Sequence, residues 1–320
     1  MKRRYFGTAI FLLVFFFLVG SISAQSRIFV SIGTGTTGGS YYPIGGAMAK
    51  IWSDNIPNMK ATVQSTGGTI QNIQLMADKQ TEAGFTDTRY VFAYRGKGGQ
   101  FEGKPQTWIR GLVPLYPEPS NIVVLKNSGI KTLADLKGKR ISIGAVGSGT
   151  EATSRELLGI LGMDPAKDIR PFMLGTGETA SAFQDKRIDA AILVGSLGMS
   201  SVVEITSLGL VDFLEVDDAT FKALKEVNET WVQFSIPENY YKNQPKAVKT
   251  YASFNILSVR EDLPEDLAYQ MTKTLFENKA DLVAVRATME NMRLENVPKI
   301  EIPIHPGAKR YYREKGVKLP

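Results

Sequence analysis

The sequence predicts an α/β protein of two lobes, each a mostly parallel sheet covered by helices, with a hinge between the lobes. One observation is a recurring unit: a run of β-branched residues, a loop of glycine, serine and threonine, and then an apolar pattern of helical period. Such alternation is typical of parallel sheets with covering helices. The second observation is size, because 320 residues with 43% hydrophobic residues suffice for two domains with a core each. The third is a proline-rich stretch at 112–119, which we expect to cross between the lobes.

The first lobe is expected at 27–118 together with 263–320, because the helical pattern after Pro264 can pack back on the N-terminal units. Its strands are expected at three places: 28–32, 61–64 and a run that ends at Phe85. The helix after the first of these strands is expected to begin near Tyr42. Pro43 then lies in the first turn, where its missing N–H costs no hydrogen bond.

The second lobe is expected at 119–262. Its strands are expected at 122–125, 140–144, 188–194 and 253–259. Between the first two strands, the segment 133–139 is typical of a short helix and a turn. Ser148 and Glu151 have the spacing of a capping box, in which a serine side chain accepts from the backbone N–H three residues later. A helix is therefore expected directly after Ser148.

The N-terminal residues have the pattern of an export signal. Three basic residues at 2–4 precede an apolar run at 9–19, and small residues follow up to Ala24. The run is shorter than the ~20 apolar residues of a membrane span, so cleavage near Ala24 is favoured over an uncleaved anchor. We therefore expect a signal peptide at 1–24 and a periplasmic protein that is not embedded in the membrane.

Composition argues against several classes of function. The net charge of +6 falls to +3 without residues 1–24, and no run of basic residues favours nucleic acid. The absence of cysteine excludes disulfides, thiol chemistry and a lipidated N-terminal cysteine. The sole histidine, His305, lies in a proline-rich segment and is expected to have a packing or surface role. We expect a monomer without a metal site or cofactor.

The candidate site consists of four loops, each joining a strand to a helix. Ligands of open α/β sheets bind beyond the carboxyl ends of the strands, where free backbone N–H groups and helix dipoles favour an anion. Glycine allows a ligand to approach the backbone closely, and hydroxyl groups add donors. If the lobes face each other, two loops from each lobe form one cleft for a small solute with a carboxylate. The expected ligand-binding residues are Thr36, Gly39, Ser40, Tyr41, Ser65, Thr66, Gly67, Asp87, Ser148, Gly149, Thr150, Gly195 and Ser196.

A dinucleotide site and a catalytic site are the competing interpretations of these loops. Gly33, Gly35 and Gly38 form the G-x-G-x-x-G pattern between a strand and a helix. The second strand, however, ends without the acidic residue that binds ribose in such sites. The loop also lacks a phosphate-binding lysine, and a catalytic triad would depend on His305. We therefore expect a binding protein and not an enzyme.

Three charged residues near these loops have two interpretations each. Asp87 is either an acid of a helix N-terminus or the partner of an ammonium or hydroxyl group of the ligand. Arg89 and Arg110 are either solvated bases or bidentate partners of a ligand carboxylate. The sequence leaves both alternatives open.

The segment 33–47, GTGTTGGSYYPIGGA, resembles the opening of the TAXI-type solute receptors of TRAP (tripartite ATP-independent periplasmic) transporters. Three further segments match in order: 66–68, 130–151 and 257–264. The resemblance covers essentially the whole chain after the signal. The glycine-rich opening with Tyr-Tyr-Pro is specific, whereas Asp-Leu-Lys-Gly-Lys at 135–139 occurs in many binding proteins.

The resemblance implies a periplasmic binding protein of type II-like architecture that closes about its hinge. Such a receptor delivers its solute to a TRAP-type membrane permease, which an ion gradient drives without ATP hydrolysis. Ligands of this family resemble glutamate and related dicarboxylates, so we expect a glutamate-like amino acid or a dicarboxylate. A receptor that presents its ligand to a membrane kinase stays open as an alternative.

Overall fold

The computed structural model describes residues 27–319, so the predicted signal peptide at 1–24 lies outside the described residues. Ten strands are present in this range: β1 Ile28–Gly33, β2 Met59–Gln64, β3 Ala83–Thr86, β4 Ile109–Leu125, β5 Arg140–Ser142, β6 Arg170–Phe172, β7 Ala190–Val194, β8 Val211–Phe213, β9 Val232–Ile236 and β10 Val248–Arg260. The α-helices of this range are α1 Tyr41–Asn55, α2 Thr69–Ala77, α3 Arg89–Arg95, α4 Gly149–Ile160, α5 Thr176–Gln184, α6 Ser200–Ser207, α7 Asp218–Val227, α8 Glu265–Glu277, α9 Lys279–Val285 and α10 Pro306–Glu314. The α/β class that the sequence predicts is therefore confirmed.

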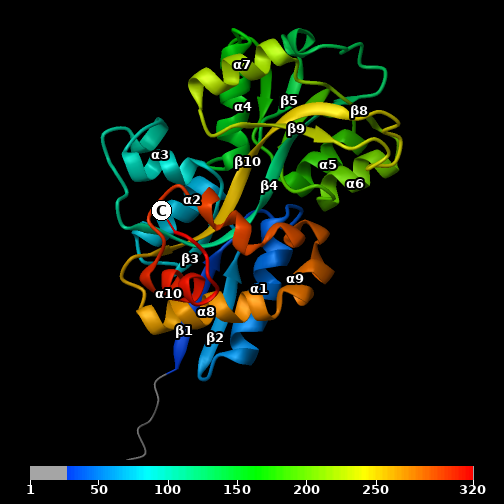
Figure 1. The fold of residues 1–320 in the computed structure, drawn as a ribbon. Coiled ribbons are helices and arrows are strands. Elements are labelled where there is room, and N and C mark those ends of the chain that lie inside the picture. The colour runs from blue at the N-terminus through cyan, green and yellow to red at the C-terminus, as the bar shows by residue number, and fades with distance from the viewer. Residues whose placement is uncertain (1–26, 320) are drawn as a thin grey trace, which may run out of the picture.

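The strands form one curled sheet with two parallel parts. Its order is β2-β1-β3-β10-β4-β7-β5-β6, with β8 beside β4 and β9 beside β10. β1 pairs in parallel with β2 and β3, and β5 pairs in parallel with β6 and β7. The two parts are joined by β4 and β10, which run antiparallel to each other (Figure 1). The expectation of mostly parallel sheets holds for the strands on either side of this pair.

The proline-rich stretch 112–119 is part of a strand and not a separate connection between strands. It lies within β4, which continues without interruption through the strand that we expected at 122–125. The pairing of β4 with β10 contains register shifts, one of them between Phe254 and Ile256 opposite Pro117 and Pro114. Such irregularities are where a strand can contain residues that have no N–H to donate. The crossing expected from the prolines is thus made by an extended strand.

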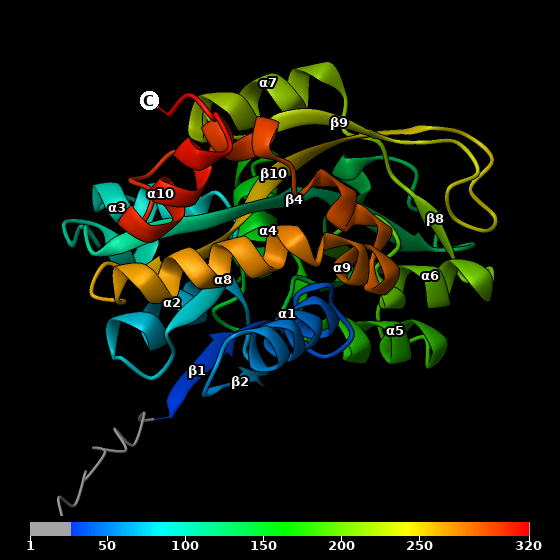
Figure 2. The same cartoon turned by 60° about the horizontal axis from the view of Figure 1, so that its bottom comes forward.

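The buried side chains form separate cores on the two sides of the β4–β10 pair. One core combines residues from Val30 to Tyr116 with residues from Ile256 to Tyr312, and we call this part lobe one. The cores between Ile122 and Tyr251 define lobe two. In lobe one, α1 and α8 lie side by side in both views (Figures 1 and 2), and the indole of Trp52 donates to the backbone oxygen of Met271 at 3.0 Å. The boundaries at 118/119 and 262/263 stay a prediction.

Two further findings concern His305 and the lengths of the apolar helices. His305 is 1% exposed and caps α10, since its Nδ1 accepts from the backbone N–H of Gly307 at 3.3 Å. The expected packing role is therefore what the structure shows. Between residues 27 and 319, no helix is long and apolar enough to cross a membrane.

Candidate functional site

A small cavity lies where lobe one meets lobe two. The centres of water-sized molecules can occupy about 50 Å³ of it, and since one water needs roughly 10–15 Å³ by this measure, the space suits a small solute. Lobe one and the β4 strand contribute Gly35, Thr36, Gly39, Ser40, Tyr41, Gly67, Gly68, Thr69, Asp87 and Glu118. Lobe two contributes Gly144, Ala145, Ser148, Gly149, Thr150, Leu174, Gly175, Thr176, Leu193 and Val194.

Four helices begin at the wall of this cavity. The first residues of α1, α2, α4 and α5 are Tyr41, Thr69, Gly149 and Thr176, and all four line the cavity. Ser148 Oγ caps α4, because it accepts from the N–H of Glu151 at 2.9 Å, and at α5 the Glu178 carboxylate accepts from the N–H of Gly175 at 2.7 Å, whereas α1 and α2 have no side-chain cap. Uncapped N–H groups and the positive ends of the helix dipoles favour a negative charge at this place. Two of the helices come from each lobe, so an anion in the cavity would contact both.

Most of the residues expected in the site line the cavity. They are Thr36, Gly39, Ser40, Tyr41, Gly67, Asp87, Ser148, Gly149 and Thr150. The other four predicted residues do not line the cavity. Ser65 donates to the oxygen of Gly35 at 3.1 Å, and Thr66 is buried and its hydroxyl donates to the backbone oxygen of Thr34 at 3.0 Å. Gly195 and Ser196 lie where lobe two touches Ser40.

The two lobes contact each other directly around the cavity, so the cleft between them is closed in this structure. The hydroxyls of Thr36 and Thr176 lie 2.8 Å apart, and those of Ser40 and Ser196 lie 2.7 Å apart. The backbone N–H of Gln71 donates to the oxygen of Gly147 at 3.3 Å. These bonds join residues that are distant in sequence, and they would break if the lobes moved apart.

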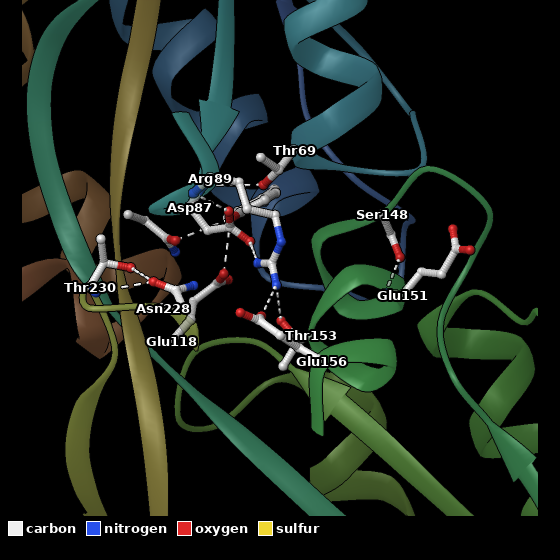
Figure 3. A network of polar contacts seen from close by, with 12 residues as sticks. Thr69, Asp87, Arg89, Glu118, Ser148, Glu151, Thr153, Glu156, Asn228 and Thr230 are labelled. Atoms are coloured by element: carbon white, nitrogen blue, oxygen red, sulfur yellow. Dashed lines mark hydrogen bonds and ion pairs between the residues drawn. The ribbon is translucent and has the colours of Figure 1, made fainter. Parts of the chain in front are cut away.

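A buried ion-pair network borders the cavity on one side. Asp87 is 1% exposed and accepts from Arg89 Nη1 at 2.7 Å and from the backbone N–H of Arg89 at 3.0 Å. The same guanidinium reaches lobe two, where it donates to Thr153 Oγ1 at 2.7 Å and lies 3.3 Å from Glu156 Oε2 (Figure 3). Burial raises the pKa of Glu156, and the charge of Arg89 opposes this shift. Arg89 therefore bridges the lobes and does not line the cavity itself.

Glu118 is a second carboxyl group of the cavity wall, and it was not expected from the sequence. It is 4% exposed, and its Oε2 lies 2.9 Å from the hydroxyl of Tyr41. The same hydroxyl lies 3.2 Å from Oδ1 of Asn255 on β10. Burial and, to a smaller extent, the negative charge of Asp87 raise the pKa of Glu118, whereas hydrogen bonds from Tyr41 and Asn255 and the charge of Arg89 lower it, and the net pKa is about 8. Burial also raises the pKa of Tyr41 well above its usual range.

The two arginines left open by the sequence have partners within the protein. Arg89 is committed to Asp87 and Glu156 as described. Arg110 forms an ion pair with Glu261 at the far end of β4 and is not part of the cavity wall. Neither guanidinium therefore lines the cavity. The groups of the cavity wall that attract an anion are the backbone N–H groups at the helix N-termini.

The fold and this cavity define a two-lobe α/β protein with a cavity between its lobes. A model of the NMT1-like family matches residues 32–316, and the chain belongs to this family. A protein of Bordetella bronchiseptica RB50 has a similar structure, with 16% identity over 91% of this chain and 98% of its own, and a TM-score of 0.53. Tv2483, solved bound to L-arginine, has 12% identity over 84% of this chain and 94% of its own, with a TM-score of 0.50. DctP7 of Bordetella pertussis, an extracytoplasmic solute receptor binding pyroglutamic acid, has 12% identity over 91% and 92% of the chains, with a TM-score of 0.48.

Proposed function

We propose that this protein is a periplasmic solute-binding protein that captures a small organic anion in the cavity between its lobes. One observation carries this proposal: helix N-termini from both lobes converge on a single small cavity. Backbone N–H groups fixed in this way bind a carboxylate without side-chain rearrangement. Because the ligand contacts both lobes, it stabilises the closed arrangement through contacts that the open one lacks.

The polar groups of the cavity favour a glutamate-like amino acid over a dicarboxylate. The carboxylate of the ligand would lie at the helix N-termini, where Thr36, Ser148 and Thr150 add hydroxyl groups. Asp87 and Glu118 of the cavity wall suit an ammonium group, because a second carboxylate beside them would face two acids. We propose that the nine predicted residues of the wall contact the ligand. The other predicted residues, Ser65, Thr66, Gly195 and Ser196, would hold the loops in place.

Delivery to a membrane permease is the second part of the proposal. The resemblance of 33–47 to TAXI-type receptors supports a TRAP-type permease as the partner. The basic and apolar pattern of 1–24 supports export with cleavage near Ala24, and the mature protein would act as a monomer without cofactor or catalysis. A sensing role with a membrane kinase would use the same cleft. A neighbouring gene for a large fused permease supports transport, and a neighbouring histidine kinase gene supports sensing.

The first experiment is mass spectrometry of any small molecule released from the purified protein by denaturation, followed by calorimetry with organic acids and amino acids. We expect saturable binding of one compound class with a carboxylate. Tyr41→Ala should weaken this binding without unfolding the protein, because Tyr41 lines the cavity. Tyr42→Ala is the matched control, because its side chain lies outside the wall. If no organic acid or amino acid binds, the proposed function is wrong.

A further inference from the structure

The cavity wall contains two acids and lacks a cation that would neutralise the second one. Asp87 and Glu118 both line the cavity. The guanidinium of Arg89 pairs with Asp87 and directs further donors to Thr153 and Glu156. Among residues 27–319, no ion pair to Glu118 is present. An ionised Glu118 would therefore be a buried charge without a partner, which is costly.

The hydrogen-bond partners of Glu118 are neutral groups. The Tyr41 hydroxyl lies 2.9 Å from Glu118 Oε2 and 3.2 Å from the side-chain amide oxygen of Asn255, whose Nδ2 atom has no hydrogen-bond partner among the described residues. A hydrogen bond from a neutral hydroxyl compensates a buried negative charge less than a cation does, so this setting favours the neutral form of the carboxyl group.

The titratable and charged groups that face Glu118 come from three elements. Tyr41 faces it from α1, Asp87 and Arg89 from the start of α3, and Tyr116 lies two residues before it on β4. Among them, the charge of Asp87 raises the pKa of Glu118 and that of Arg89 lowers it, with Asp87 having the larger effect. The pKa of Glu118 is about 8 chiefly because burial without a paired cation disfavours the ionised carboxylate.

We propose that Glu118 is the proton-exchanging group of the cleft: it is protonated while the cleft holds no cation, and it releases its proton to solvent when a ligand ammonium group lies between it and Asp87. The step is balanced, because one positive charge enters with the ammonium and one leaves as the proton. No covalent bond of the ligand changes. This proposal rests on the proposed function, since it needs a small ligand in the same cavity.

Proton release predicts how affinity depends on pH. Below a pH of about 8, each unit of pH increase should raise the affinity for an amine-bearing ligand up to about tenfold. At pH 7, with a pKa of about 8, binding should release about 0.9 proton per ligand. A ligand without an amine has no cation to offer, and its affinity should not rise with pH through this group.

Calorimetry at pH 7 in phosphate and in Tris tests the release directly, because these buffers take up a proton with different heats. The probes are L-glutamate and glutarate, which differ in the amine. For L-glutamate we expect about 0.9 proton released by the wild type and none by Glu118→Gln, which keeps the shape of the side chain. Glu215→Gln changes an exposed glutamate of lobe two and is the matched control, with proton release equal to that of the wild type.

Thermal unfolding without ligand tests the protonated resting state separately. The folded pKa of Glu118, about 8, is above its ordinary value of 4.5, so the folded state holds the proton longer than the unfolded state as pH rises. From pH 5 to 8 the Tm of the wild type should therefore fall relative to that of Glu118→Gln. Tyr41→Phe removes a hydrogen bond that lowers the pKa of Glu118, so in that variant the fall should continue to higher pH.

The outcomes separate this proposal from the proposed function. Proton release with L-glutamate that Glu118→Gln abolishes supports the proposal. Binding of L-glutamate without proton release, or binding of glutarate alone, overturns it and leaves capture of an organic anion intact. A Tm difference that does not change between pH 5 and 8 also overturns it. If neither probe binds, the glutamate-like ligand class and the role of Glu118 fall together.

Discussion

Gly38→Ala should prevent the lobes from closing fully while leaving each lobe intact. A Cβ at Gly38 would lie 2.7 Å from the backbone nitrogen of Gly177 and 2.9 Å from its Cα, across the contact between lobe one and lobe two. Because ordinary contacts of this kind begin at 3.4 Å, the backbones would have to separate by about 0.7 Å. Gly38 itself does not line the cavity, so a loss of affinity would report closure and not a lost ligand contact.

The magnitude follows from the cost of inserting a methyl group into a packed contact. Such overpacking costs about 1–3 kcal/mol, and since about 1.4 kcal/mol corresponds to a factor of ten in Kd, the affinity should fall roughly 5- to 150-fold. The atoms that the added Cβ would clash with belong to the backbone of Gly177, so rotation of a side chain cannot relieve the clash. The unfolding free energy of the ligand-free protein should change less, because an open cleft avoids the clash.

Calorimetry with L-glutamate and small-angle scattering with and without it measure these two effects. Gly177→Ala is the matched control, because a Cβ added on the other side of the same contact meets nothing within 4 Å. We expect the wild type and Gly177→Ala to bind and contract alike, and Gly38→Ala to bind weakly and contract less. Equal affinity and equal contraction in all three proteins would refute the argument that this contact belongs to the ligand-bound state.

Three further predictions concern stability. Ser148→Ala removes the N-cap of α4, so urea unfolding should show a loss of about 1 kcal/mol; an unchanged midpoint would mean that the cap contributes nothing. Arg89→Gln leaves the acids of its network unpaired in a buried place, which should cost about 3–5 kcal/mol. That loss should be smaller at pH 5 than at pH 8, because burial raises the pKa of Glu156 and its carboxylate is neutralised more readily as the pH falls, and a loss independent of pH would contradict this reason. Burial lowers the pKa of His305, so the folded state resists its protonation and the wild type should lose stability as pH falls below the ordinary value of 6.5. His305→Asn keeps a capping side chain, and its Tm should decline less over the same range; parallel curves would be evidence against this assignment.

The sequence was sufficient to predict most of the loops that line the cavity because their signal is local. A β-branched strand, a loop of small hydroxylic residues and a helical pattern follow one another directly, as at 61–76. Parallel strands present their carboxyl ends at the same edge, so such loops gather there in any protein of this class. This is why Thr36, Gly67 and Ser148 could be expected at the cavity from local sequence patterns alone.

The sequence could not indicate Glu118, because its place depends on pairing between distant segments. β4 pairs with β10, more than 100 residues away, and the three prolines around Glu118 concealed the strand. Thr176 was missed for a related reason, since the strand before it, β6, has only 3 residues and no clear alternation. Ser65 and Thr66 have the right composition but point to backbone groups of their own lobe. Composition alone cannot distinguish such structural hydroxyls from groups that face a ligand.

The division of lobe one between the two ends of the chain has a consequence for the order of folding. Lobe two can complete its cores once Tyr251 has been synthesised, because all of their members lie between Ile122 and that residue. Lobe one must wait until Tyr312 has been synthesised, since this residue is part of its core and its hydroxyl donates to the oxygen of Leu112 at 2.6 Å. Contacts over such separations form slowly. A nascent chain can therefore have a folded lobe two while lobe one, and with it the cavity between the lobes, stays incomplete until α10 is available.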